Sequence, residues 1–247
     1  RNIYKAFASI MRAAVEWELI DESPCRNIKL PKLTHEEGKA YSESEVRLLL
    51  ERLSERESPE KRIIVELAIT SGARQGEIAA LEEKHLNPKN NTIFIEQALV
   101  VAKKDEFEQV RDGLILKETK GKRKRLVTIS EYVMNELLRW VTMKKYQLEQ
   151  LGEERKWKEH TFLFSDEYGK PYRPDSISQW WDRFMDRNPD LKRIRFHDLR
   201  HTSASLLIEA GEHLKAIQYR LGHASMGTTM NTYGHLLPGA DQRAASH

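Results

Sequence analysis

Apolar residues at three- and four-residue spacing, interrupted by glycine and proline, constrain the fold of this chain more than any other feature. This spacing predicts helices over 2–20, 42–53, 59–72, 74–83, 131–151, 174–184, 197–210, 213–221 and 226–236. Strand patterns occur only at 91–95 and at 114–130, and the second reads as a β-hairpin with its turn near Gly121. Residues 97–113 have no clear pattern. The predicted fold class is α+β, mostly α-helical with a small antiparallel β-sheet.

A segment without periodicity, residues 31–41, divides the chain. It contains Pro31 and Gly38 and predicts a linker between a helical segment, residues 1–30, and one large domain, residues 42–247. The chain begins with RNIYKAF, without methionine and already inside a helical pattern. We therefore expect it to be a fragment whose N-terminal part is missing.

The composition excludes several classes of protein. No apolar run approaches the roughly 20 residues of a membrane span, and no signal-peptide pattern is present. The single cysteine, Cys25, excludes an internal disulfide framework and fits a reducing cytoplasm. The net charge of +3 does not by itself predict nucleic-acid binding. Basic residues gather in 117–125 and 192–195, although each cluster taken alone is most simply a solvated surface.

The stretch RFHDLRHTSA, residues 195–204, carries the most unusual cluster of side chains. His197, Arg200 and His201 share one face of the predicted helix. The two histidines resemble the H-E-x-x-H motif of zinc hydrolases, but Asp198 replaces the glutamate and Arg200 brings a fixed charge. A helix start with surface histidines is the simpler interpretation of this stretch alone. A third is an anion site, in which His197 and Arg200 donate near a helix N-terminus.

Four further positions carry chemistry only in combination. Arg74 stands at a predicted helix start, with Glu77 placed to orient it, although a surface ion pair there would contribute little. Lys120 lies beside the predicted hairpin turn and is either a proton donor or one solvated lysine among several. His223 follows Gly222 at a predicted helix end. Tyr233, ten residues later, is more commonly a core residue than a nucleophile.

Taken in order, these pieces resemble the tyrosine recombinases, and in particular the phage and conjugative-transposon integrases. The motifs are A-R-x-x-E, a lysine in a β-hairpin, H-x-x-R, L-G-H, and a tyrosine ten residues further on. The resemblance runs from about Ser42 to Leu237 and implies the DNA breaking-rejoining catalytic fold. It also implies that residues 1–30 are the C-terminal remnant of a helical core-binding domain.

The resemblance implies a role for each site residue. Tyr233 attacks the scissile phosphorus and forms a 3′-phosphotyrosine, so that neither ATP, a cofactor nor a metal is required. His197 takes the tyrosine proton, Lys120 protonates the leaving 5′-oxygen, and Glu77 and His201 support the site. The residues expected around the phosphate are Arg74, Lys120, His197, Arg200 and His223. Two arginines are suited to this task because their charge is permanent and their planar fork fits phosphate oxygens.

Expected partners follow from the same resemblance. Double-stranded DNA carrying attachment sites is the expected substrate, bound by a tetramer in the bacterial or phage-infected cytoplasm, in association with the nucleoid. The two basic clusters are expected to contact this DNA through Lys122, Arg123, Lys124, Arg125, Arg193 and Arg195. Weak site recognition is expected because most of the core-binding domain is absent.

Three other functions compete with this prediction. Type IB topoisomerases share the chemistry but usually carry lysine where this chain has His197. A non-catalytic DNA-binding protein on the same fold is a second alternative, although every expected catalytic residue is present. A metal-dependent hydrolase is the third, and it depends only on the H-D-L-R-H stretch.

Overall fold

The computed structural model describes residues 2–28, 30, 39–102, 110–119 and 124–234. The described chain divides into two compact units, residues 1–37 and residues 38–247. The boundary falls within the predicted linker. Tyr41, which the sequence places in that linker, instead belongs to the second unit: it is 1% exposed, and its hydroxyl donates to the carbonyl of Lys192 at 2.6 Å.

Unit 1 contains one helix, α1 (Asn2–Glu16), which ends four residues earlier than predicted. The chain turns back after it, and the hydroxyl of Tyr4 donates to the carbonyl of Cys25 at 3.0 Å. Several large apolar side chains of this unit are exposed, among them Ile3, Phe7 and Trp17.

Unit 2 is built mainly from helices whose ends follow the capping signals. Ser42 and Glu45 form the predicted capping box at the start of α2 (Glu43–Arg56). Pro59 begins α3 (Pro59–Ser71), and Gly72, with φ of +62°, ends it. The remaining helices are α4 (Gln75–Ala79), α5 (Glu131–Glu149), α6 (Pro174–Arg187), α7 (Asp198–Glu209), α8 (Leu214–Leu221) and α9 (Met226–Tyr233). The predicted helix over 74–83 is only five residues long, and the short 3-10 helix Glu83–His85 follows it.

The strands pair differently from the prediction. β1 (Leu86–Asn87), β2 (Thr92–Ile95) and β5 (Arg125–Thr128) form one antiparallel sheet in the order β1-β2-β5. β3 (Gln97–Val101) and β4 (Leu114–Glu118) form a second. The predicted hairpin between 114–118 and 125–128 is therefore wrong. Both segments are real strands, but each pairs with a strand from 92–101, because residues 97–101 are extended and offer β4 a partner of their own.

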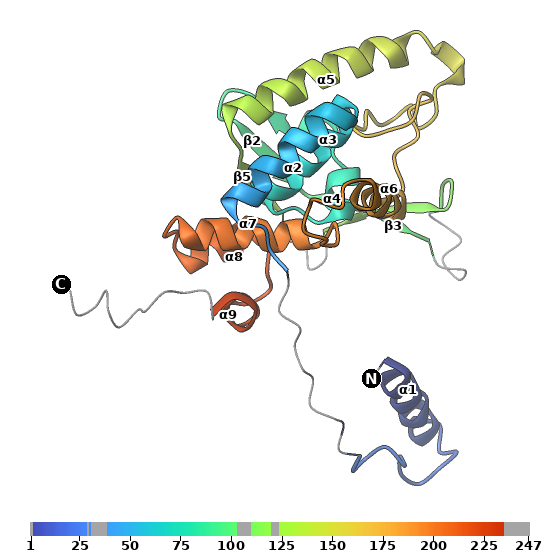
Figure 1. Ribbon diagram of the computed structural model, residues 1–247. Helices are drawn as coiled ribbons and strands as arrows, with labels where there is room; N and C mark the ends of the chain where they lie inside the picture. The colour runs from blue at the N-terminus through green and yellow to red at the C-terminus, as the bar shows by residue number, and fades with distance from the viewer. Residues whose placement is uncertain (1, 29, 31–38, 103–109, 120–123, 235–247) are drawn as a thin grey trace, which may run out of the picture. The chain divides into compact units, whose positions relative to one another are not determined.

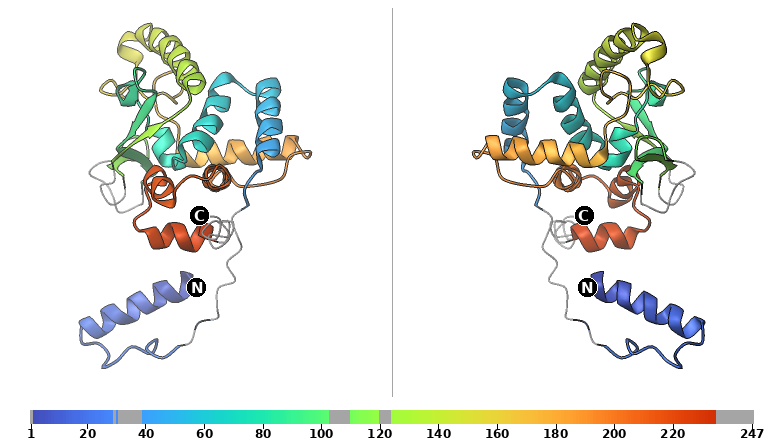
Figure 2. Two further views of the ribbon diagram at one scale, coloured as in Figure 1. Left: turned by 90° about the vertical axis from the view of Figure 1, so that its left-hand side faces the viewer. Right: turned by 90° about the vertical axis from the view of Figure 1, so that its right-hand side faces the viewer.

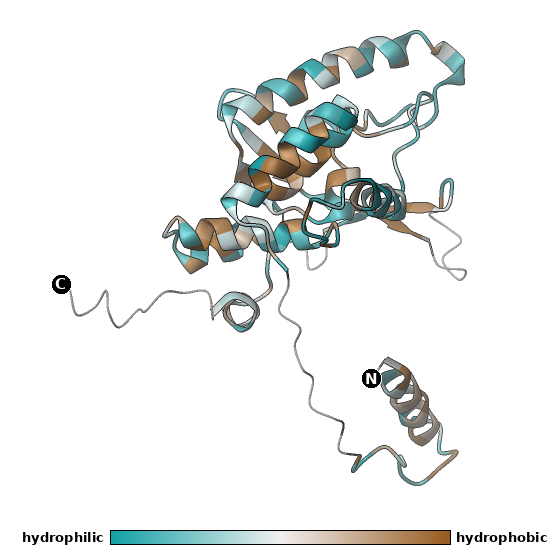
Figure 3. Ribbon diagram, in the orientation of Figure 1, coloured by the Kyte–Doolittle hydropathy of each residue, from teal (hydrophilic) through white to brown (hydrophobic). Residues whose placement is uncertain are grey.

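The core of unit 2 lies between α3, the strands and α6. Trp181, Phe184 and Phe164 are fully buried there. α3 is colored as largely apolar in Figure 3, in keeping with its position inside the unit. A second, smaller apolar cluster joins α7, α8 and α9 and includes Leu221 and Tyr233. This cluster fixes the position of α9 on the unit.

Figures 1 and 2 show α8 and α9 on the side of unit 2 that faces away from α5. α8 contacts α7, α9 and β5, and α7 contacts α3. The ends of α3, α7, α8 and α9 are thereby brought together. The fold class agrees with the prediction: mostly helical, with small antiparallel sheets. No helix in the described part of the chain is long and apolar enough to cross a membrane.

Candidate active site

Arg74 occupies the turn between α3 and α4. Its backbone N–H and its Nη1 both donate to the carboxylate of Glu77, at 2.8 and 2.9 Å. The expected contact between these two residues is therefore present. Glu77 is buried, whereas 41% of the Arg74 side chain is exposed. A buried carboxylate thus orients a guanidinium that still faces solvent.

Arg125 contacts the same carboxylate from β5. Its Nη2 lies 2.7 Å and its Nη1 3.2 Å from the Glu77 oxygens, and its Nε donates to the carbonyl of Arg220 at 2.8 Å. Only 2% of Arg125 is exposed. The predicted contact between Arg125 and DNA is not seen in this arrangement, because the guanidinium is buried and is engaged by Glu77 and by the carbonyl of Arg220. Burial alone would raise the pKa of Glu77, but the hydrogen bonds from Arg125 and Arg74 outweigh it and hold that pKa below its usual value.

Arg200 holds the ends of two helices. It is 4% exposed, and its two Nη atoms donate to the carbonyls of Gly72 and Leu221, the latter at 2.5 Å. Carbonyls at helix C-termini have no partner within the helix, so a cation is favoured there. Burial and the nearby Arg74 lower the pKa of Arg200, but a guanidinium remains charged at neutral pH.

Tyr233 ends α9 with its hydroxyl inside the protein. The residue is 2% exposed, and its Oη lies 2.8 Å from Nδ1 of His201. Burial raises the pKa of the phenol to about 12, although the charge of Arg200 acts in the opposite direction. The sequence assigns the proton of this tyrosine to His197, whereas the structure places His201 beside the oxygen.

The two other histidines lie near this pair. The ring of His197 lies 5.8 Å from that of His201, measured between centroids, and nearly perpendicular to it. His223 follows the left-handed Gly222, its Nδ1 lies 2.9 Å from Oγ1 of Thr229, and its ring is parallel to that of Tyr233. Burial lowers the pKa of His223 to about 4, and Arg200 and Arg74 add to this effect. His223 is therefore neutral at pH 7.

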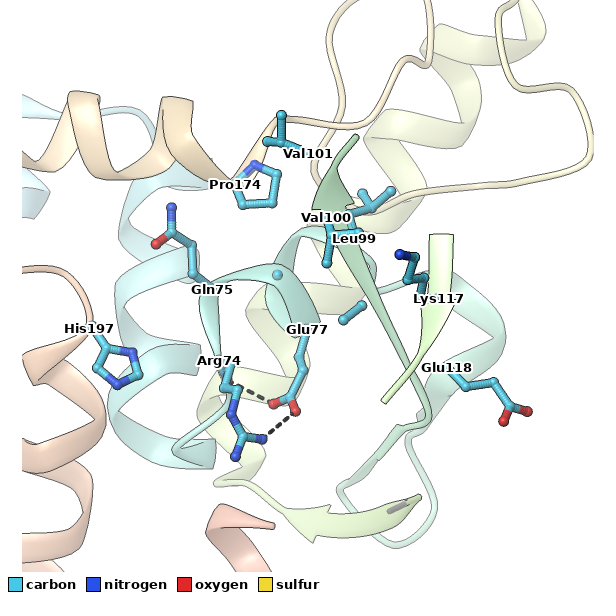
Figure 4. A pocket seen from close by; sticks show the side chains of 12 residues that line it. Arg74, Gln75, Glu77, Leu99, Val100, Val101, Lys117, Glu118, Pro174 and His197 are labelled. Atoms are coloured by element: carbon cyan, nitrogen blue, oxygen red, sulfur yellow. Dashed lines mark hydrogen bonds and ion pairs between the residues drawn. The ribbon is translucent and has the colours of Figure 1, made fainter. Parts of the chain in front are cut away.

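A cavity of about 590 Å³ opens beside Arg74. Figure 4 shows Arg74 at its edge, with His197 on one side and β3 and β4 on the other. Much of the remaining lining is apolar, from Leu99 and Val100 of β3 and from Pro174. Arg74 and His197 thus present donors at the edge of an open hollow, which suits an anionic group approaching from solvent.

The other predicted residues belong to the two basic clusters. Lys120, Lys122 and Arg123 lie outside the described residues. Lys124 is exposed and pairs with Glu96 and Glu118. Arg193 and Arg195 are exposed as well, and pair with Asp186 and Asp198. Among the described residues, no group of three His, Cys, Asp or Glu side chains could hold a metal ion.

Within a helical α+β unit, a buried tyrosine on α9 thus lies near Arg200, His201 and His197 of α7 and His223 after α8, and Arg74 reaches the carbonyl of Gly222 beside them. This is the arrangement that the resemblance to tyrosine recombinases leads us to expect. The comparisons agree with this class. The chain matches the phage integrase family over residues 39–239 and belongs to that family.

Curated relatives include the ICEBs1 integrase of Bacillus subtilis (strain 168), 29% identical over 99% of this chain and 63% of the relative. The integrase of Staphylococcus phage L54a is 29% identical over 72% of this chain and 48% of the relative. The chain therefore spans about half to two thirds of the length of these relatives.

Solved structures share the fold at lower identity. The Tn1549 transposon integrase, solved in complex with a circular intermediate DNA, is 19% identical with a TM-score of 0.78 and covers 99% of this chain and 77% of that chain. The catalytic domain of bacteriophage HP1 integrase is 21% identical, with a TM-score of 0.54. The match covers 84% of this chain and 93% of that domain.

Proposed function

We propose that this chain carries the catalytic domain of a site-specific DNA recombinase that integrates and excises a mobile element. It cuts and rejoins DNA strands through a 3′-phosphotyrosine intermediate. The observation that supports this most directly is the buried Tyr233 hydroxyl beside His201, in the same site as Arg74 and Arg200.

The proposed reaction exchanges one phosphodiester for another. Tyr233 Oη bonds to phosphorus, the P–O5′ bond breaks, and the 5′-oxygen leaves with the electron pair and takes up a proton. The 5′-hydroxyl of another strand then attacks and releases the tyrosine. Because each step conserves one phosphodiester bond, strand exchange needs no nucleotide hydrolysis.

The two arginines act on the non-bridging phosphate oxygens in this proposal. Positioned donors stabilise the charge that gathers there in the transition state. Arg74 is the more available, because much of its side chain faces solvent. Arg200 already donates to two carbonyls but keeps further N–H groups. His223 is a further donor to these oxygens, and Lys120, outside the described residues, supplies the proton to the 5′-oxygen.

The partners are proposals of the same kind. Double-stranded DNA with attachment sites is the substrate, and four chains assemble on it, in the cytoplasm beside the nucleoid. Residues 1–30 contribute to a core-binding domain and residues 42–247 form the catalytic domain. The exposed Lys124, Arg193 and Arg195 remain proposed DNA contacts, as do Lys122 and Arg123.

The test uses a pool of 40-bp duplexes with a randomised centre and a single nick, incubated with the chain in EDTA. Cleavage next to the nick releases a short strand, so that the covalent complex cannot be resealed. Wild-type chain is expected to give a protein–DNA adduct stable in detergent, and sequencing of the trapped DNA identifies the preferred duplex. Tyr233→Phe is expected to give none, because phenylalanine has no nucleophilic oxygen.

The matched control is Tyr219→Phe, which removes the hydroxyl of a largely exposed tyrosine on the neighbouring helix α8, where it accepts a hydrogen bond from the backbone N–H of Leu126. This variant should keep the adduct. An adduct that persists in Tyr233→Phe would overturn the proposal. An adduct that forms without EDTA but not with it would favour a metal-dependent reaction. Relaxation of supercoiled DNA without site preference would favour a topoisomerase.

A further inference from the structure

The hydroxyl of Tyr233 is held by a histidine that the sequence motifs place outside the catalytic set. His201 Nδ1, at 2.8 Å, is the hydrogen-bond partner of this oxygen among the described residues. The rings of His201 and Tyr233 are 5.5 Å apart between centroids. The ring of His197 is 5.8 Å from that of His201, and no hydrogen bond joins His197 to Tyr233 in the described part of the chain.

Packed residues of α7 fix the position of His201. Leu199 and Ser203, on either side of it in the sequence, are buried against the core. Arg200 anchors the same turn of helix to the ends of α3 and α8. The tyrosine approaches from α9, whose last turn belongs to the small apolar cluster of α7 and α8. The contact therefore joins two packed elements and does not depend on an exposed side chain.

We propose that His201, and not His197, accepts the phenolic proton of Tyr233 as this oxygen attacks phosphorus. The inference rests on the proposed function. The O–H bond of Tyr233 breaks and its proton moves to Nδ1 of His201, while the Oη–P bond forms and the P–O5′ bond breaks. The 5′-oxygen takes its proton from a separate donor. In the rejoining step His201 returns its proton to the departing tyrosine.

The protonation state of His201 fits this task. Burial of the ring lowers the pKa of His201. The imidazole is therefore neutral at pH 7, and its unprotonated nitrogen can accept a proton. The phenol becomes acidic only as its oxygen bonds to phosphorus, so the proton moves during attack and not before. The titratable and charged groups around His201 are Arg195, His197, Asp198, Arg200, His223 and Tyr233.

The experiment measures single-turnover cleavage of the trapped duplex from pH 5 to pH 9. His201→Asn keeps a polar atom near the position of Nδ1 but cannot take up a proton. We expect it to slow cleavage by about 100-fold at neutral pH, the lower end of what general base catalysis contributes. Wild-type cleavage should rise with pH and level off below the usual histidine pKa. This inflection should vanish in His201→Asn and persist in the matched variant His197→Asn.

A duplex with a bridging 5′-sulfur at the scissile position separates the two proton transfers. A thiolate leaves without protonation, so this substrate should restore cleavage to variants that lack the proton donor for the leaving group. His201→Asn should remain slow on it, because its defect lies at the nucleophile. The inference would be overturned if His201→Asn cleaved the ordinary duplex within threefold of the wild-type rate or faster. It would also be overturned if the sulfur substrate restored cleavage by this variant.

A spectroscopic measurement keeps the inference falsifiable if His201→Asn folds poorly. In the DNA-free chain, Tyr233→Phe should shift the imidazole ¹⁵N resonance of His201 Nδ1. The resonances of His213, an exposed residue that caps α8, should not move. An unmoved His201 resonance would overturn the contact itself. A wild-type chain that forms no adduct removes the proposed function and this inference together, whereas an unaffected His201→Asn removes the inference alone.

Discussion

Glu77 lies between two arginines that have different tasks. Arg125 is fully desolvated and neutralises the carboxylate, whereas Arg74 is oriented by it and faces solvent. Because the three groups together carry one net positive charge, Arg74 can still present that charge to an anion. Without Arg125, the carboxylate would cancel the charge of Arg74 at the edge of the cavity.

This arrangement predicts a large stability effect at a residue that looks like a DNA contact. Arg125→Met is expected to lower the free energy of unfolding by about 3–5 kcal/mol, because it leaves a buried carboxylate short of a partner. Urea unfolding measures this loss. The double variant Glu77→Gln/Arg125→Met also removes the charge of the buried carboxylate, and should therefore regain part of the lost stability.

Lys124→Met is the matched control, one residue away on the same segment. Its pairs with Glu96 and Glu118 are exposed, so the expected loss is only about 0–1 kcal/mol. A variant Arg125→Met that is as stable as Lys124→Met, but binds DNA more weakly, would show that Arg125 is a surface contact after all.

At the scale of elements, the close approach of α3 and α8 positions both arginines of the site. Gly72 ends α3 with φ of +62°, and a Cβ there would lie 2.6 Å from Cδ2 of Leu221, a fully buried side chain at the end of α8. Arg200 joins the same two helix ends through their carbonyls. A side chain at position 72 therefore requires the buried side chain of Leu221, or the backbone of one of the two helices, to shift.

Gly72→Ala is expected to lower the free energy of unfolding by about 2–4 kcal/mol, because left-handed backbone strain and overpacking both act there. Gly211→Ala is the matched control: its φ is +80°, but a Cβ there meets nothing within 4 Å. Backbone strain alone should lower the free energy of unfolding of Gly211→Ala by about 1–2 kcal/mol. Thermal unfolding of the two variants gives the comparison, and equal losses would contradict the packing argument.

At the scale of the whole molecule, residues 1–37 and 38–247 are separately compact. A chain lacking residues 1–37 is therefore expected to unfold within about 2 °C of the intact chain's main transition. Its adduct yield on the nicked duplex should fall, because the proposed core-binding residues are lost. Calorimetry and the adduct assay measure the two effects, and a midpoint lowered by more than about 5 °C would mean that the units unfold as one.

Much of the fold could be read from local patterns. The capping box at Ser42, the start at Pro59 and the stops at Gly72 and Gly222 are local features, and the structure has helix ends at each of them. Strand pairing could not be read in this way. Residues 97–101 carry no clear alternation, so the sequence predicts β5 as the partner of β4, whereas β4 pairs with β3.

The sequence alone determined the family, the residue types of the site and their order along the chain, because spacing and residue type are local properties. Only the tertiary structure decided which of these side chains meet. Arg125 and Arg193 look alike in a sequence, but one is buried against Glu77 and the other is exposed. His197 and His201 share one helix face, and the packing of α9 against α7 and α8 is what places Tyr233 beside the second. Contacts between distant segments depend on how the helices pack, and local residue spacing does not specify that packing.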